Sequence, residues 1–162
     1  MRTFIIRPAM LEDVEAIFHV HQSSVKNLCI QQYSAEQIAF WLDGRSPEMY
    51  VPAISKGSLW VAERNHILGF LEIDGSEISK LFVSSDNAFS GVGRKLLNVA
   101  LDYIVSNGSE KAYLESTVTA VPFYEKHGFR VVGHGVFSHG NSPISLEIAK
   151  MVCLFPRHDS CS

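Results

Sequence analysis

The segment from Val83 to Leu97 constrains the fold more than any other part of the sequence. A β-rich run there passes through a turn containing Gly91 and Gly93 into a helix, whose apolar residues recur at helical spacing until Asn107-Gly108. The first N–H groups of a helix have no acceptor within the helix, and the helix dipole favours negative charge beside them. Because glycines also allow a close approach to the main chain, the turn predicts an anion site suited to a diphosphate.

The two residues after the turn, Arg94 and Lys95, favour the same prediction. Cations in the first turn of a helix oppose its dipole, so they suit a purely structural helix poorly and a phosphate site well. Two other phosphate motifs do not match. A dinucleotide fingerprint requires a small residue where Leu96 stands, and a P-loop requires Gly-Lys followed by Ser or Thr. The glycines alone leave open a turn that only redirects the chain.

The pattern of elements along the chain predicts an α+β fold. Three β-rich runs are separated by short turns, one of them the hairpin signal Asp74-Gly75, which indicates an antiparallel meander. Ser34 and Gln37 form the pattern of a capping box at the start of an earlier helix. We expect strands at 4–7, 59–63, 66–73, 78–83, 112–116, 129–132 and 144–154, helices from 10, from 34, from 94 and at 121–127, and a hairpin loop at 133–143.

These elements form one domain over residues 1–155, with a mixed, mostly antiparallel central sheet flanked by about four helices and a polar tail at 156–162. Of the 162 residues, 46% are hydrophobic and 19% are charged, which excludes disorder as the main state. The net charge of -3 offers no basic face to nucleic acid.

The cysteines and the apolar runs bear on the cellular compartment. Cys29, Cys153 and Cys161 lack the spacing of metal or redox sites, so we expect free thiols and no metal. The sequence holds no apolar run long enough to cross a bilayer and does not begin with a signal peptide pattern. These observations predict a cytoplasmic protein without a membrane partner.

A second informative segment follows one strand after the glycine turn. It has the pattern Ala-x-x-x-Tyr-x-x-x-Gly-Phe, running from Ala120 through Tyr124 to Gly128-Phe129. The turn itself, from Ala88 to Gly93, is similar to a Gln/Arg-x-x-Gly-x-Gly/Ala motif. In this order and spacing, and with the opening Ile5-Ile6-Arg7-Pro8-Ala9, the two segments resemble the GNAT acetyltransferase superfamily over about residues 5–151. The resemblance implies acetyl-CoA as co-substrate.

The resemblance also implies a set of site residues. Tyr124 would be the general acid for the departing thiolate, or would stabilise it by a hydrogen bond, because a phenol is a weaker acid than a thiol. Glu77 and Glu72 are the candidates for a base that deprotonates the amine, with a solvated carboxylate as the alternative role. The implied acetyl-CoA contacts are Leu81, Phe82, Val83, Ala88, Phe89, Ser90, Gly91, Val92, Gly93, Arg94, Lys95, Thr117, Phe123 and Tyr124.

Two departures from the family pattern weaken the expected affinity: Ala88 replaces the usual Gln or Arg, and Thr117 replaces a frequent Asn. Tyr33 and Trp41 would wall the acceptor pocket, or else belong to the core. We expect an N-acetyltransferase, monomeric or homodimeric, in which a primary amine of a small molecule or protein attacks the thioester directly. A non-catalytic module that binds acetyl-CoA or CoA is the alternative.

Overall fold

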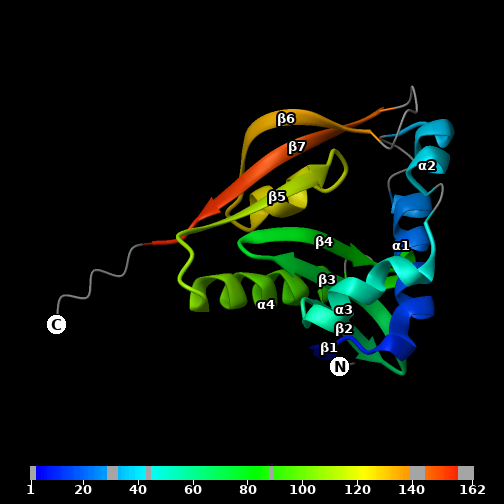
Figure 1. Cartoon of the computed structure of the whole chain (residues 1–162). Coiled ribbons are helices and arrows are strands. Elements are labelled where there is room, and N and C mark those ends of the chain that lie inside the picture. Colours follow the sequence, from blue (N-terminus) through cyan, green and yellow to red (C-terminus); the bar gives the residue numbers. More distant parts are fainter. Residues whose placement is uncertain (1–2, 29–32, 43–44, 88–89, 139–144, 157–162) are drawn as a thin grey trace.

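The structure is a computed structural model that describes residues 3–28, 33–42, 45–87, 90–138 and 145–156, with side chains except at 27, 28, 40–42, 137, 138 and 145. Seven strands form one sheet in the order β1-β2-β3-β4-β5-β7-β6 (Figure 1). All neighbours are antiparallel except the parallel pair β4 and β5, which confirms a mixed, mostly antiparallel sheet. The strands are β1 (Ile5–Pro8), β2 (Leu59–Arg64), β3 (His66–Asp74), β4 (Glu77–Val83), β5 (Lys111–Thr117), β6 (Arg130–Ser138) and β7 (Ser145–Leu154).

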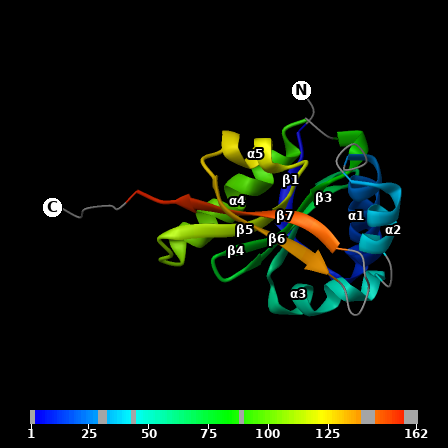
Figure 2. The ribbon, with the colours of Figure 1, turned by 90° about the horizontal axis from the view of Figure 1, so that it is seen from above.

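Helices cover both faces of this sheet (Figure 2). The long helix α4 packs against β3, β4 and β5, whereas α1 packs against β3 and β4 within a separate core. The α-helices of the described residues are α1 (Val14–Leu28), α2 (Ala35–Leu42), α3 (Val51–Lys56), α4 (Val92–Ser106) and α5 (Val121–Lys126). Short 3-10 turns lie at Leu11–Asp13, Pro47–Tyr50 and Ser85–Asn87.

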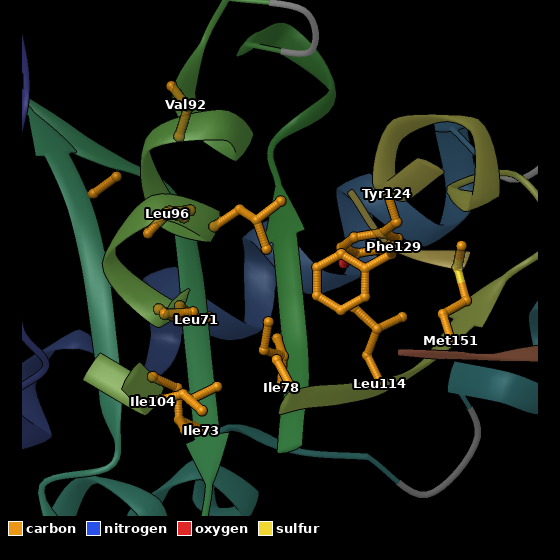
Figure 3. Close-up of a cluster of buried hydrophobic side chains, with 14 of the residues drawn as sticks. Leu71, Ile73, Ile78, Val92, Leu96, Ile104, Leu114, Tyr124, Phe129 and Met151 are labelled. Carbon is orange, nitrogen blue, oxygen red and sulfur yellow. The ribbon is translucent and has the colours of Figure 1, made fainter. Parts of the chain in front are cut away.

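Two hydrophobic clusters hold these layers together. The larger one joins the sheet to α4 and α5, and Figure 3 shows Leu71, Leu96, Leu114, Tyr124 and Met151 converging there. The smaller one lies under α1 and contains Ile17, Tyr50 and Phe70, among others. A fully buried aliphatic or aromatic side chain contributes about 1.5–3 kcal/mol, so both clusters stabilise β3 and β4 strongly. The central strands are therefore a rigid support for the segments at their ends.

The structure corrects two local predictions. The expected loop at 133–143 is wrong for residues 133–138, which continue β6 after a bulge between Val131 and Gly133. The glycines that suggested a loop instead lie beside the long side chains of β7, with a Cβ position at Gly135 only 3.2 Å from Lys150 Cε. Residues 139–144 lie outside the described part. Helix α3 was not expected, because six residues are too few for a clear period.

The predicted capping box is confirmed. The Gln37 N–H donates to Ser34 Oγ at 3.0 Å and the Ser34 N–H donates to Gln37 Oε1 at 2.9 Å, which completes the capping box. Cys153 is a free, partly buried thiol, whereas Cys29 and Cys161 lie outside the described residues. Within the described ranges, no helix combines the length and the apolar character that a membrane span requires.

Candidate active site

The parallel strands β4 and β5 separate soon after they begin. They pair only at Glu77 with Tyr113 and at Ile78 with Leu114. Beyond that point β4 continues against β3 as far as Val83, and β5 continues against β7 as far as Thr117. The sheet is therefore open between two well-supported strands.

The main chain of β4 faces this opening at alternate residues. The Ser84 N–H donates to the Leu68 carbonyl at 2.8 Å, and Phe82 lies opposite Phe70 in the same ladder. Alternation in an antiparallel ladder then directs the N–H and C=O groups of Leu81 and Val83 toward β5. These groups have no strand partner there in the part of the chain that the structure describes. They can bind a linear ligand that carries amide groups.

The glycine turn lies at the end of the same opening. Gly91 has φ 91°, is the N-cap residue of α4, and receives no side-chain capping bond within the described ranges. The first helical hydrogen bond runs from the Lys95 N–H to the Gly91 carbonyl at 3.1 Å. The N–H groups of Val92, Gly93 and Arg94 consequently have no acceptor within the helix. The turn therefore presents several N–H donors at the position where the sequence predicts an anion site; Ala88 and Phe89 lie outside the described residues.

Gly93 is the point where α4, α5 and β4 meet. A Cβ placed on Gly93 would lie 3.5 Å from Phe123 Cζ and 3.6 Å from Val83 Cγ2. The two cations of the turn have different surroundings. Lys95 Nζ lies 5.2 Å from the centre of the Phe4 ring, whereas Arg94 Nη2 lies 4.0 Å from a Cβ position at Gly91. Of these two cations, the Arg94 guanidinium therefore lies beside the glycine turn. Ser90, which precedes Gly91 in the turn, is exposed.

Tyr124 enters the larger core from α5, on the side of β4 that faces β5 (Figure 3). Its side chain is only 6% exposed, and its ring packs against Phe123 at 5.1 Å and Phe129 at 5.6 Å between centroids. Burial raises the pKa of this phenol above its usual value, so the hydroxyl is firmly protonated. In this environment Tyr124 is better suited to donate a hydrogen bond than to transfer its proton completely.

The turn between β5 and α5 adds two hydroxyl groups. Thr117 Oγ1 accepts a hydrogen bond from the Ala120 N–H at 3.2 Å and supports the start of α5. Thr119 Oγ1 is buried and has no hydrogen-bond partner among the described residues. The sequence analysis did not select Thr119. The available signal was its position as a polar residue inside the Ser116–Phe129 segment, which carries the second family motif.

A cavity of about 250 Å³ opens between β4 and β5 on the side of α1. Glu77, Ser79 and Phe82 of β4 line it, together with Glu115 and Thr117 of β5. Burial, followed by the neighbouring carboxylates of Glu115 and Asp74, raises the pKa of Glu77. A carboxylate with a raised pKa is a stronger base, so Glu77 is suited to accept a proton in this cavity.

The other candidate base lies outside the cavity lining. Glu72 accepts a hydrogen bond from Ser79 Oγ at 2.7 Å and pairs with Lys80 at 3.4 Å. Its carboxylate is already bound on both sides. The structure therefore brings Glu77 to the cavity and assigns Glu72 to a local polar network.

The two aromatic residues predicted for the acceptor pocket have different outcomes. Tyr33 lines the cavity, but its hydroxyl donates to the Glu147 carbonyl and accepts from the Val118 N–H, each at 2.8 Å. It thereby ties the start of α2 to β7 and to the turn after β5. Trp41 belongs to α2, and its side chain lies outside the described part.

A larger, more apolar concavity of about 740 Å³ lies elsewhere, between the start of α5 and the strands β6 and β7. Pro122, Val131 and Val136 line it, and no residue of β4 or of the glycine turn contributes. It shares Ile148 with the smaller cavity but is otherwise lined by different residues of the described chain.

A sheet that opens between two parallel strands beside an uncapped glycine turn defines the fold class of the GNAT acyltransferases. The family described as "Acetyltransferase (GNAT) domain" matches residues 29–149, so the chain belongs to the GNAT acetyltransferase family. The expected family and fold class are confirmed.

Individual relatives agree with this assignment. Peptidyl-lysine N-acetyltransferase YjaB of Escherichia coli is 33% identical over 98 residues, which cover 57% of this chain and 63% of that protein. A GCN5-related N-acetyltransferase from Rhodopseudomonas palustris superposes with a TM-score of 0.87 at 22% identity, covering 96% of this chain and 98% of that one. The PaiA N-acetyltransferase of Thermoplasma acidophilum, solved in complex with coenzyme A, gives 0.75 at 22% identity, covering 94% and 99%.

Proposed function

We propose that this protein is an acetyl-CoA-dependent N-acetyltransferase whose acceptor amine enters the cavity beside Glu77. One observation carries the proposal: β4 and β5 pair only at their starts, and the unpaired stretch of β4 lies between the uncapped turn of α4 and the cavity that Glu77 lines. Two substrates could therefore meet there from opposite faces of the sheet. The coenzyme A complex of the PaiA neighbour and the name of the YjaB relative support this reading.

In this proposal the acetyl-CoA contacts are divided among three segments. The N–H groups of Val92, Gly93 and Arg94 bind the diphosphate, with the Arg94 side chain nearby. The main chain of Leu81 and Val83 binds the pantetheine amides as an adjacent strand would. The remaining contacts come from Phe82, Ala88, Phe89, Ser90, Gly91, Lys95, Thr117, Phe123 and Tyr124.

Acetyl-CoA supplies an activated acetyl group in the form of a thioester. An N–H group of β4, from Leu81 or Val83, polarises the carbonyl oxygen as negative charge develops on it. Glu77 takes a proton from the attacking amine, which is otherwise mostly protonated because alkyl amines have a pKa near 10. Tyr124 donates a hydrogen bond to the departing sulfur. The base and the donor act from the two sides of the sheet opening.

The test is the release of CoA thiol with a panel of primary amines, comparing the wild type with Tyr124→Phe and Glu77→Gln. Removing one positioned donor or base typically lowers kcat by about 10²–10⁴-fold. Glu125→Gln, an exposed change on the same short helix as Tyr124, is the control and should retain the wild-type rate. Tight acetyl-CoA binding without thiol release from any acceptor would identify the chain as a non-catalytic binding module. A calorimetric titration that shows no acetyl-CoA binding to the folded protein would refute both functions.

A further inference from the structure

The segment that joins β4 to the glycine turn is fastened to helix α1. Ser23 of α1 lies beside Ser85, the first residue of the 3-10 turn that follows β4. The Ser85 N–H donates to Ser23 Oγ at 3.1 Å, and the two hydroxyl oxygens lie 2.7 Å apart, within hydrogen-bond distance. One side chain of α1 therefore binds this segment through both its main chain and its side chain.

Further hydrogen bonds lead from this contact to the start of α4. The Asn87 N–H donates to the Ser84 carbonyl at 2.9 Å, which closes the 3-10 turn. The Asn87 carbonyl accepts in turn from the Ser90 N–H at 3.3 Å and from the Ser90 hydroxyl. Ser90 directly precedes Gly91, the N-cap residue of α4. A short series of hydrogen bonds thus connects α1 with the uncapped end of α4.

The sheet supports only the beginning of this segment. The Ser84 N–H donates to the Leu68 carbonyl at 2.8 Å, which extends the ladder of β3 and β4 by one bond. Between Val83 and Val92 no strand occurs among the residues that the structure describes. The contact with Ser23 is therefore the tertiary support of the segment after it leaves the sheet. A diphosphate site made of N–H groups depends on such support, because a donor that is already in place costs the ligand less ordering.

The same contact could instead serve only to hold α1 on the sheet. The helix, however, has a stronger attachment of its own: Ile17 and Val20 are buried in the smaller hydrophobic cluster, and α1 packs against β3 and β4. Ser23 and Ser85 are only partly buried, so their bonds add little to that packing. Loss of the contact should consequently affect the turn more than the helix.

We propose that Ser23 is a positioning residue for acetyl-CoA, which holds the glycine turn where its N–H groups can bind the diphosphate. Ser23 acts through Ser85 and does not itself contact the cofactor. His21, two residues earlier on α1, lines the cavity beside Glu77, so the same helix contributes to both substrate sites. This inference rests on the proposed binding of acetyl-CoA and adds a residue of α1 to it.

The expected effect follows from the population of the binding conformation. In Ser23→Ala the Ser85 N–H and hydroxyl lose their partner, so the turn is free to leave its position. We expect the Kd of acetyl-CoA to rise about tenfold, which corresponds to about 1.4 kcal/mol and to the loss of one or two hydrogen bonds. A rise of this size means that about one tenth of the free variant molecules hold the turn in the binding conformation.

The experiment compares two thioesters. Calorimetric titration with acetyl-CoA measures the Kd in the wild type and in Ser23→Ala. Thiol release is then measured with acetyl-CoA and with acetyl-pantetheine, which lacks the diphosphate and the nucleotide. In Ser23→Ala we expect kcat/KM to fall about tenfold for acetyl-CoA and to stay unchanged for acetyl-pantetheine, whereas kcat at saturating acetyl-CoA is retained. A purely structural role of Ser23 would not distinguish the two thioesters.

A matched control and a double variant accompany this comparison. Ser106→Ala removes an exposed hydroxyl at the far end of α4, where it donates to the Tyr103 carbonyl at 2.9 Å, and it should keep the wild-type constants. Ser85→Ala removes one of the two bonds and should raise the Kd by less than Ser23→Ala. The double variant should equal Ser23→Ala alone, because both changes break the same contact. If Ser23→Ala does not fold, as circular dichroism establishes, Ser85→Ala provides the comparison of the two thioesters.

The outcomes separate this inference from the proposed function. An unchanged Kd in folded Ser23→Ala overturns the inference, even where urea unfolding shows a loss of stability. An equal fall of kcat/KM with both thioesters also overturns it, and so does a double variant in which the two free-energy changes add. Those results leave the acetyltransferase function in place. If acetyl-CoA binds but no acceptor releases thiol, the acetyltransferase function is refuted and the calorimetric comparison still decides the inference. Absence of acetyl-CoA binding to the wild type refutes both.

Discussion

Replacing Gly93 by Ala should stabilise the free protein and weaken its binding of acetyl-CoA. The new methyl group would lie 3.5–3.6 Å from Phe123 and Val83, which is ordinary van der Waals contact, so the free fold accepts it. Alanine is a better helix former than glycine by about 0.8–1 kcal/mol within a helix, and Gly93 is near the end, so a gain of about 0.5 kcal/mol is expected. For a chain of this size that raises Tm by about 1–2 °C.

The same methyl group occupies the space between β4 and α5 through which the pantetheine arm should pass. Crowding of this kind costs about 1–3 kcal/mol, which corresponds to a Kd about tenfold or more higher. Urea unfolding measures the first effect and calorimetry with acetyl-CoA the second. Asn98→Ala, on the exposed side of α4, is the control: it should raise stability by a similar amount and leave the Kd unchanged. Stabilisation of Gly93→Ala with an unaltered Kd would refute the assigned path.

Three further predictions concern single side chains. Activity should fall as pH drops through the raised pKa of Glu77, and Glu77→Gln should abolish that acidic limb of the kcat/KM profile. Asp13→Asn should cost about 1–3 kcal/mol in urea unfolding at pH 7, because Asp13 accepts hydrogen bonds from Arg7 at 2.9 Å and from the Met10 N–H at 2.7 Å. Burial opposes ionisation of Asp13, but these hydrogen bonds outweigh it and lower the pKa of the carboxyl group. The stabilisation by Asp13 is therefore fully present above the unfolded pKa of about 3.9, and it is lost as pH falls through the folded pKa. An unchanged acid unfolding transition in the Asn variant would contradict this. Tyr33→Phe should also lower the free energy of unfolding by about 1–3 kcal/mol, because the Val118 N–H loses the hydroxyl oxygen that accepts its hydrogen bond. An unchanged stability in urea would show that water replaces the hydroxyl.

The fold was largely predictable because, in most of the chain, the local sequence signals agree with the tertiary structure that the chain adopts. The Asp74-Gly75 hairpin, the capping box at Ser34 and the glycine turn each have a local physical cause, and each is present. The length of β6 was not predictable, because Gly133 and Gly135 favour a loop locally and are accommodated only by the side chains of β7.

The candidate site was predictable where it depends on the main chain and less so where it depends on distant side chains. The turn at Gly91 and Gly93 followed from the order of strand, glycines and helix. The cavity required Arg45, His21 and Glu115, which come together only through tertiary packing. His21 did offer a signal, since it occupies the buried stripe of α1 four residues after Ile17 and four before Val25, where a polar residue is unexpected.

The two residue pairs between β4 and β5 also affect how the molecule opens and unfolds. The ladder of the sheet is interrupted there, so few backbone hydrogen bonds join the strands β1 to β4 to the strands β5, β7 and β6, and the side chains of the larger hydrophobic cluster carry most of the connection. A ligand whose amide groups bond to the main chain of Leu81 and Val83 would extend the hydrogen-bonding of β4 into this gap. At a hundredfold excess over its Kd, acetyl-CoA would add about 2.7 kcal/mol to the free energy of unfolding, and the exchange of those amides that exchange only through global unfolding should slow accordingly.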